Sequence, residues 1–353
     1  MEKLRIGIVG AGLITTVKHL PSIKKLQHKC SLVALCDINK EVLIKLKNEY
    51  SINNIYTDVN QMLSNENIDI VHINTPPSTH KEIAQLCLEK KVNVLMEKPM
   101  ATNYQDCLDL IEVASNNGVK IMVGHSELFY PPILRMKKTI ADGLLGEVRG
   151  MNIFRSTPKS YMTSVKNHWA NKLPGGVIGE TGPHLVYLSL EFIGQPIEVY
   201  SLGRKIITDY SWTPYDDYRI ILQGDKVTSS ISSIYTSDHW GAQLIVWGDD
   251  GLIICDFQTM NFKFQKRPKL SNKFNLGYDE IISGMNTIYS VIKTGVNTKF
   301  RRYKNTHEYL IEGFVDSVIK GTSPPITGED GAKTVQVLEK IVKSLETNLS
   351  ERI

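Results

Sequence analysis

The sequence predicts an α/β protein with a doubly wound parallel sheet first and a second α/β domain built on a large, mostly antiparallel open sheet. Three observations predict this class. Short apolar strands alternate with helical stretches from Leu4 to Val123, these strands are nearly continuous in Val, Ile and Leu, and more closely spaced strands follow residue 148. Alternating strands and helices indicate a parallel sheet covered on both faces, and continuous apolar strands indicate burial on both sides.

The first domain is predicted to span residues 1–124. Its strands are expected at 4–10, 31–37, 68–73, 92–97 and 119–124, and its helices at 18–25, 40–50, 79–89 and 104–116. Each strand is followed by a helical stretch, as the parallel arrangement requires, because parallel strands need a crossover connection.

The second domain is predicted to span residues 125–353. Turn signals at Gly224-Asp225 and Asp249-Asp250-Gly251 are typical of antiparallel hairpins. The expected strands are at 147–154, 197–207, 218–224, 227–235, 242–248 and 252–257, the expected helices at 133–141, 182–192, 279–293, 305–320 and 329–346, and a surface loop at 265–277.

Composition excludes several classes of protein. The chain of 353 residues carries a formal charge of +4, and its basic residues are dispersed rather than clustered, so nucleic-acid binding gains no support. The five cysteines are an odd number with no Cys-x-x-Cys pair, which favours reduced core thiols. The sequence shows neither a secretory signal nor the run of about 18 to 20 apolar residues that a membrane-spanning helix needs. We expect a cytoplasmic protein without a membrane partner.

A dinucleotide site is predicted at the first strand–helix turn. Residues 7–15 read GIVGAGLIT, which places Gly10, Gly12, Leu13 and Ile14 in this turn. One glycine allows a tight turn and the other lets a pyrophosphate approach the helix N-terminus. Thr15 stands where a third glycine is usual, so it is expected either to push the helix outward or to offer its hydroxyl to a phosphate. Alternatively, the two glycines serve only the turn.

Asp37 favours NAD over NADP. It ends the second strand, 25 residues after Gly12, where a carboxylate accepts hydrogen bonds from an adenosine ribose. Its charge would repel a 2′-phosphate, and no Arg follows closely to receive one. NAD is therefore the expected cofactor.

Further motifs resemble those of the Gfo/Idh/MocA oxidoreductases, named for glucose–fructose oxidoreductase and inositol dehydrogenase. Asn74-Thr75-Pro76-Pro77 with His80 follows one strand, and Glu97-Lys98-Pro99-Met100 follows the next. Gly175-Gly176 then leads into Glu180-Thr-Gly-Pro-His184, which is similar to the family's Asp-x-Gly-x-x-His segment, with Glu and a shorter spacing here.

The resemblance implies an NAD-binding Rossmann domain and a second domain that is often used for oligomer contacts. It also implies oxidation or reduction of a secondary alcohol or ketone on a sugar, sugar derivative or cyclitol. Carried over residue by residue, it names Lys98, Glu180 and His184 as catalytic, and Asn74, Thr75, Pro76, His80, Glu97 and Lys98 as cofactor-binding. A homodimer or homotetramer is expected on the same ground.

The chemistry explains why these residue types are needed. Hydride leaves a carbinol carbon as the hydroxyl proton leaves, so the site needs a base and a cation that stabilises developing alkoxide charge. Imidazole titrates near neutral pH, which suits His184 as the base, and Lys98 supplies the cation. Glu180 would orient His184 or bond a substrate hydroxyl. The structural alternatives are a strand-end lysine, a packed helix histidine and a helix-capping glutamate.

The sequence leaves two alternative roles for each of the remaining candidate residues. His80 could pack at its helix start, Asn74 and Thr75 could form the turn, and His125 and Glu127 could face the cleft or act as hinge residues. Residues 155–172, rich in cations and aromatic groups, form either a substrate loop or a solvated connection.

No metal is expected, because among His125, Glu127, His168, Glu180 and His184 only the last two have the spacing of a ligand pair. Two rival functions use the same fold. One is a non-redox enzyme that oxidises its substrate transiently with NAD, and the other is a non-catalytic dinucleotide-binding regulator.

Overall fold

The computed structural model describes residues 3–267 and 304–347, together with the isolated helical positions 277, 281, 284, 285, 288 and 292. The chain divides into two compact units. The first comprises residues 1–126 and 304–336, and the second comprises residues 127–303 and 337–353. The first boundary lies within two residues of the predicted one.

The first unit is built on a six-stranded sheet in the order β3-β2-β1-β4-β5-β6, and every neighbouring pair is parallel. This order is that of a dinucleotide-binding doubly wound fold. The strands are β1 Leu4–Val9, β2 Cys30–Cys36, β3 Asn54–Tyr56, β4 Ile70–Ile73, β5 Asn93–Met96 and β6 Ile121–Val123. The predicted parallel sheet is confirmed, and the edge strand β3 is an addition, because three residues are too few to give an apolar pattern.

Helices connect these strands, and three of them begin at a side-chain cap. Asn39, Asp58 and Asn103 each accept hydrogen bonds from backbone N–H groups of the first turn that follows. The helices are η1 Thr15–His19, α1 Leu20–Lys25, α2 Lys40–Tyr50, α3 Val59–Asn65, η2 Pro77–Thr79, α4 His80–Glu89 and α5 Tyr104–Asn117. Of these, α3 was not predicted from the sequence.

Residues 304–336 join the first unit, whereas the sequence assigned them to the second domain. They contain α9 Thr306–Lys320 and the start of α10 Gly328–Thr347. Helix α9 packs against η1, α1 and β5, and Lys29 forms ion pairs with Glu312 and Asp316 on it. A bridge between Met122 and Thr327 extends the contact to β6. The chain thus returns to the first unit through contacts between distant residues, which local patterns do not show.

The second unit is built on a seven-stranded sheet in the order β13-β12-β11-β7-β10-β9-β8. Only β7 and β10 pair in parallel; the other neighbouring pairs are antiparallel, which confirms the prediction of a mostly antiparallel sheet. The strands are β7 Val148–Ser156, β8 Glu198–Arg204, β9 Asp217–Gln223, β10 Thr228–Ile234, β11 Gly241–Gly248, β12 Gly251–Asp256 and β13 Asn261–Lys266.

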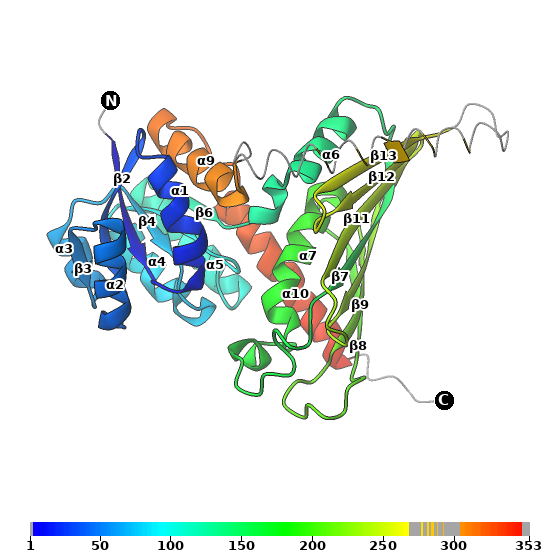
Figure 1. The fold of residues 1–353 in the computed structure, drawn as a ribbon, viewed down its shortest axis with the longest axis horizontal. Helices are drawn as coiled ribbons and strands as arrows, with labels where there is room; N and C mark the ends of the chain where they lie inside the picture. Colours follow the sequence, from blue (N-terminus) through cyan, green and yellow to red (C-terminus); the bar gives the residue numbers. More distant parts are fainter. Residues whose placement is uncertain are drawn as a thin grey trace. The chain divides into compact units, whose positions relative to one another are not determined.

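The two faces of this sheet differ in burial. Helices α6 Pro131–Ala141 and α7 Ile178–Ile193 pack on one face, as the view in Figure 1 shows. That face carries the buried side chains of Met151, Ile153, Leu222, Leu244 and Ile253. The cross-strand register places the exposed side chains of the other face together, and the large ones are Phe154, Tyr200, Leu202, Ile221 and Trp247.

One predicted segment differs from the structure, and another lies mostly outside the described residues. Strand β13 takes in residues 265 and 266 of the predicted 265–277 loop, because Gln265 and Lys266 pair with Leu252 and Gly251 of β12. The rest of that loop from 268 on, and most of the helix predicted at 279–293, lie outside the described residues, apart from isolated helical positions.

The structure bears on the expected state of the cysteines and on membrane-spanning helices. All five cysteines are buried and free, and burial raises the pKa of Cys36 and Cys87 to about 12, so these thiols are unreactive. Among the described residues, no helix has both the length and the apolar composition that a membrane span requires.

Candidate functional site

The predicted cofactor residues follow strands that end at one edge of the six-stranded sheet. Gly10 follows β1, Asp37 follows β2, Asn74 follows β4 and Glu97 follows β5. The turns contact one another: the N–H of Ala11 donates to Asp37 Oδ2 at 2.6 Å, and that of Asn74 donates to the carbonyl of Val9 at 2.8 Å. Open α/β sheets bind their ligands at this edge.

The two glycines of the turn have different surroundings. Gly10 has a φ of +96°, and a Cβ added there would lie 2.7 Å from the carbonyl carbon and oxygen of Asn74. Apart from its two chain neighbours, no described residue has an atom within 4 Å of a Cβ added at Gly12. The fold therefore requires glycine at Gly10, whereas Gly12 leaves an open surface that an approaching phosphate needs.

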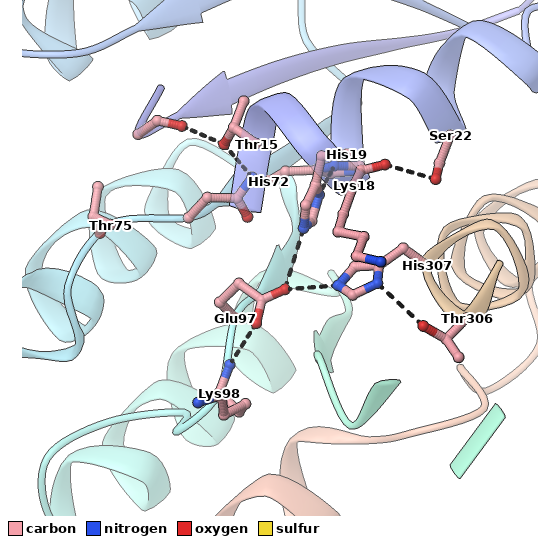
Figure 2. Close-up of polar contacts among 12 residues, drawn as sticks. Thr15, Lys18, His19, Ser22, His72, Thr75, Glu97, Lys98, Thr306 and His307 are labelled. Atoms are coloured by element: carbon pink, nitrogen blue, oxygen red, sulfur yellow. Dashed lines mark hydrogen bonds and ion pairs between the residues drawn. The ribbon is translucent and has the colours of Figure 1, made fainter. Parts of the chain in front are cut away.

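Thr15 ties the turn together from inside. Its hydroxyl donates to the Gly10 carbonyl at 2.6 Å and accepts from Asn74 Nδ2 at 2.8 Å, and the residue is fully buried (Figure 2). These bonds leave the hydroxyl directed at protein atoms rather than at a phosphate. The π-helix η1 begins at Thr15, and the outward displacement of the helix stays a prediction.

Asp37 is held in place by the backbone on both sides. Its Oδ2 accepts from Ala11, and its Oδ1 accepts the N–H of Asn39 at 2.8 Å. Each carboxylate oxygen can accept a second hydrogen bond, so the capacity to bind ribose hydroxyls remains. The next residue, Ile38, is 94% exposed, and Leu13 is 72% exposed. Ile38 is therefore a candidate cofactor contact that was not predicted from the sequence. The pattern that could have indicated it is an apolar residue directly after the acid that ends the strand.

The segment after β4 is braced by His80. The His80 ring nitrogens lie 2.9 Å from the carbonyls of Thr75 and Pro99, and the side chain is fully buried. Burial lowers the His80 pKa despite these bonds. The ring thus joins the turn at Thr75 to the turn at Pro99, so its predicted role in cofactor binding would be indirect. Pro76 is exposed beside them, and the Oδ1 of Asn74 is buried without a hydrogen-bond partner.

Glu97 is surrounded by histidines that the sequence reading did not connect. Its Oε1 lies 3.2 Å from His19 Nε2 and 3.4 Å from His307 Nε2, while His72 Nδ1 lies 3.0 Å from His19 Nδ1 (Figure 2). The backbone N–H of Lys98 donates weakly to Glu97 Oε2 at 3.4 Å. The four residues belong to η1, β4, the end of β5 and α9, so no local spacing could have joined them.

Burial and the contacts with the histidines together set the charges in this cluster. Burial by itself would raise the pKa of Glu97, but the contacts with His19 and His307 hold it well below its usual value. Burial lowers the pKa of His19 and of His72. Nearby His125 is also buried, and this lowers its pKa to about 3, so it stays neutral at cellular pH. Glu97 is therefore an ionised carboxylate, and burial favours the neutral forms of His19 and His72.

In the second unit, helix α7 carries the predicted catalytic pair. It begins at Ile178 rather than at Gly182, directly after Gly175 and Gly176, whose φ values are +73° and +75°. From Val177 to Ser189, every residue is buried except Glu180 and His184, which are half-buried. The two lie four positions apart, on one face of the helix. Within this stretch, only the two side chains that the motif singled out are partly exposed.

His184 is held by a carboxylate and a phenol. Its Nδ1 lies 2.7 Å from the Tyr187 hydroxyl and 3.3 Å from Glu127 Oε1. The Tyr187 oxygen accepts the N–H of Glu127 at 3.1 Å, and Glu127 forms a close ion pair with Arg155 of β7. The side chains of Glu127 and Arg155 are 7% and 14% exposed. The sequence left Glu127 open as a cleft or hinge residue, and the structure shows it bonded to Arg155 and beside His184.

This arrangement has a chemical consequence for His184. A carboxylate beside Nδ1 stabilises the imidazolium that forms when Nε2 accepts a proton, as in other histidine–carboxylate pairs. Arg155 forms an ion pair with Glu127, and this contact raises the Arg155 pKa against the effect of burial. Tyr187 stays neutral, because burial raises its pKa well above the usual value. His184 is thus fixed and electrostatically supported for proton transfer.

The cation-rich segment 155–172 is partly buried and mostly made of turns, and it ends in the short helix η4 Trp169–Lys172. Tyr161 packs against Trp240, and His168 stacks on Trp169, which leaves Tyr161 and Trp169 about half exposed. Whether this segment binds substrate stays a prediction.

Strand order, glycine turn and strand-ending acid define the first unit as a dinucleotide-binding domain. Residues 4–125 match the family model described as "Oxidoreductase family, NAD-binding Rossmann fold", and residues 133–254 match that of the "GFO/IDH/MocA C-terminal domain". The chain belongs to the Gfo/Idh/MocA oxidoreductase family.

The individual relatives share a third or less of their residues with the chain over the matched segments. The chain is 31% identical over 57% of its length to a 1-carboxy-3-chloro-3,4-dihydroxycyclohexa-1,5-diene dehydrogenase of Comamonas testosteroni, and this match spans about half (51%) of that protein. It is 22% identical to the myo-inositol 2-dehydrogenase of Thermotoga maritima, over 99% of the chain and 98% of the relative. Among solved structures, the WlbA dehydrogenase of Bordetella pertussis in complex with NADH and UDP-GlcNAcA has a TM-score of 0.80 at 19% identity, covering 99% of this chain and 97% of the other. That likeness shows the shared fold.

Proposed function

We propose that the protein is an NAD-dependent oxidoreductase that transfers hydride between nicotinamide and a secondary alcohol or ketone of a sugar, sugar derivative or cyclitol. The observation that carries the proposal is the pair Glu180 and His184, the only half-buried residues on the buried first three turns of α7, with Glu127 beside His184. A dinucleotide regulator has no need for a supported proton acceptor. The names of relatives that act on cyclitols agree with this substrate class.

Each residue has a separate role in the proposed reaction. NAD, when bound, accepts or donates the hydride. Gly10 and Gly12 shape the pyrophosphate turn, and Asp37 binds the adenosine ribose. His184 accepts the hydroxyl proton in oxidation and returns it in reduction, while Lys98 stabilises charge on the oxygen. Glu180, one turn before His184, is placed to hydrogen-bond a neighbouring substrate hydroxyl.

The test is an absorbance assay at the reduced-nicotinamide band. Purified protein is given NAD or NADP in parallel, with a panel of cyclitols, free sugars, sugar phosphates and nucleotide sugars. We expect NADH to form with one substrate class. A signal with NADP alone would contradict the assignment of Asp37, because its carboxylate repels a 2′-phosphate. Protein that binds NAD but stays silent with every substrate would favour the non-redox enzyme or the regulator.

We also propose a homo-oligomer that buries the open face of the seven-stranded sheet. Phe154, Ile221 and Trp247 lie on that face and are 37% to 39% exposed, so a partner subunit would remove a wide apolar surface from water. Ile221→Asp is expected to shift a dimer or tetramer to monomer, because a charge there cannot be buried without a partner. Light scattering after size-exclusion chromatography measures the mass. The exposed Ile319→Asp on α9 is the control, and a wild-type monomer would refute the proposal.

A further inference from the structure

The cluster of His19, Glu97 and His307 has the composition of a metal site. One donor atom of each residue lies within 4.8 Å of the donor atoms of the other two. The side chains of His19, His307 and Glu97 are 1%, 5% and 13% exposed. Two imidazoles and one carboxylate are a usual set of zinc ligands, with a fourth position open to water. Hydride transfer assigns no task to these imidazoles.

The two distances from Glu97 to the imidazoles fit one shared ion. Zinc bonds of about 2.0 to 2.1 Å in tetrahedral geometry place neighbouring ligand atoms about 3.3 Å apart. Glu97 Oε1 lies 3.2 Å from His19 Nε2 and 3.4 Å from His307 Nε2 (Figure 2). His307 Nε2 is buried and makes no hydrogen bond with any described residue in spite of this proximity. A buried polar nitrogen without a hydrogen bond needs an explanation. If Glu97 Oε1 and His307 Nε2 both point at one metal ion, they lie close together without forming a hydrogen bond.

The second ring nitrogens of His19 and His307 also have contacts that are typical of metal-binding histidines. A histidine that binds a metal through one ring nitrogen usually engages the other nitrogen in a hydrogen bond that orients the ring. His19 Nδ1 lies 3.0 Å from His72 Nδ1, and His307 Nδ1 lies 3.3 Å from Thr306 Oγ1. In both residues the Nε2 atom is the one that faces Glu97. A cation there would also balance the buried carboxylate, which is costly without a counter-charge.

We propose that His19, Glu97 and His307 bind one divalent transition-metal ion, Zn²⁺ by ligand type, which joins η1, the end of β5 and α9. Imidazole ligands favour such ions over Mg²⁺ and Ca²⁺, which prefer all-oxygen sets. No metal was expected from the sequence, because closely spaced ligands indicate a metal site there. His19 and Glu97 are 78 residues apart. The proposal assigns the Glu97 side chain to the ion rather than to the cofactor, and it stands independently of hydride transfer.

The first experiment is a Co²⁺ titration of untagged, chelator-stripped wild-type protein. We expect one equivalent to bind with the intense visible absorption of tetrahedral cobalt. One equivalent of Zn²⁺ should remove this band, and excess Mg²⁺ should leave it unchanged. Zinc should also raise the melting temperature, because an ion that binds only the folded state stabilises it. A wild-type protein without a stoichiometric tetrahedral band overturns the proposal.

Matched variants locate the ion. His307→Gln keeps a polar side chain of similar length but removes the imidazole, and it should weaken Co²⁺ binding by more than the roughly 10- to 100-fold that loss of an outer hydrogen bond costs. His28→Gln, at an exposed histidine of the same unit, should bind as the wild type does. Equal binding by wild type and His307→Gln would overturn the proposal, and the cluster would then be a chain of hydrogen bonds from His72 through His19 to Glu97. If His307→Gln does not fold, the wild-type titration decides alone.

Discussion

Lys98→Ala is expected to lower kcat by about 100- to 1000-fold on the substrate that the nicotinamide assay identifies, the usual cost of removing one group that stabilises an oxyanion. The physical reason is that alkoxide charge develops on the substrate oxygen as hydride leaves, and no neutral side chain replaces the ammonium. The affinity for NAD should stay about the same, because Gly12 and Asp37 hold the far end of the cofactor. Steady-state kinetics and fluorescence titration with NADH measure the two effects.

The matched control for Lys98→Ala is Lys90→Ala, which removes an exposed lysine just after α4 and should leave kcat unchanged. Lys98→Arg keeps the charge and is expected to recover part of the activity, since a guanidinium places its charge differently from an ammonium. Full activity in Lys98→Ala would contradict the catalytic role. Activity that falls only through a higher KM for NAD would make Lys98 a cofactor ligand instead.

The architecture could be predicted from the sequence because its signals are local. Continuous apolar strands, each followed by a helical stretch, fix the parallel sheet, and turn glycines mark the hairpins of the second sheet. The catalytic face of α7 was also within reach: Glu180 and His184 were named from a motif, although the helix begins four residues earlier than predicted. The helix packs closely there, since a Cβ added at Gly182 would lie 2.8 Å from Leu338 Cδ1.

The histidine cluster and the path of the C-terminal segment could not be predicted from the sequence. His307 reaches Glu97 only because α9 returns to the first unit, and Lys29 of the α1–β2 turn holds it there through Glu312 and Asp316. The same holds for Glu127, whose part in fixing His184 depends on Arg155 and Tyr187 from two other elements. Local patterns predict elements, and these contacts depend on how the elements pack.

Gly12→Val is expected to abolish measurable NAD binding while leaving the melting temperature unchanged. Apart from its two chain neighbours, a Cβ at Gly12 meets no atom of a described residue within 4 Å, and its φ lies outside the left-handed region, so the folded chain tolerates a side chain there. The same Cβ would occupy the space that the pyrophosphate needs to reach the backbone N–H groups. Titration with NADH and thermal unfolding without cofactor measure the two quantities, and Gly12→Ala should show a smaller loss of affinity.

Gly10→Ala is the comparison variant for Gly12→Val, because it is expected to change stability. Its Cβ would lie 2.7 Å from the Asn74 carbonyl, and its φ of +96° is strained for any L-residue. The strain and the overlap together should cost about 3 kcal/mol, which corresponds to roughly 10 °C in the melting temperature of a domain of this size. If Gly12→Val lowers the melting temperature as Gly10→Ala does, the surface at Gly12 is part of the core. If it binds NAD with wild-type affinity, the pyrophosphate does not pass Gly12, and the assigned cofactor site is wrong.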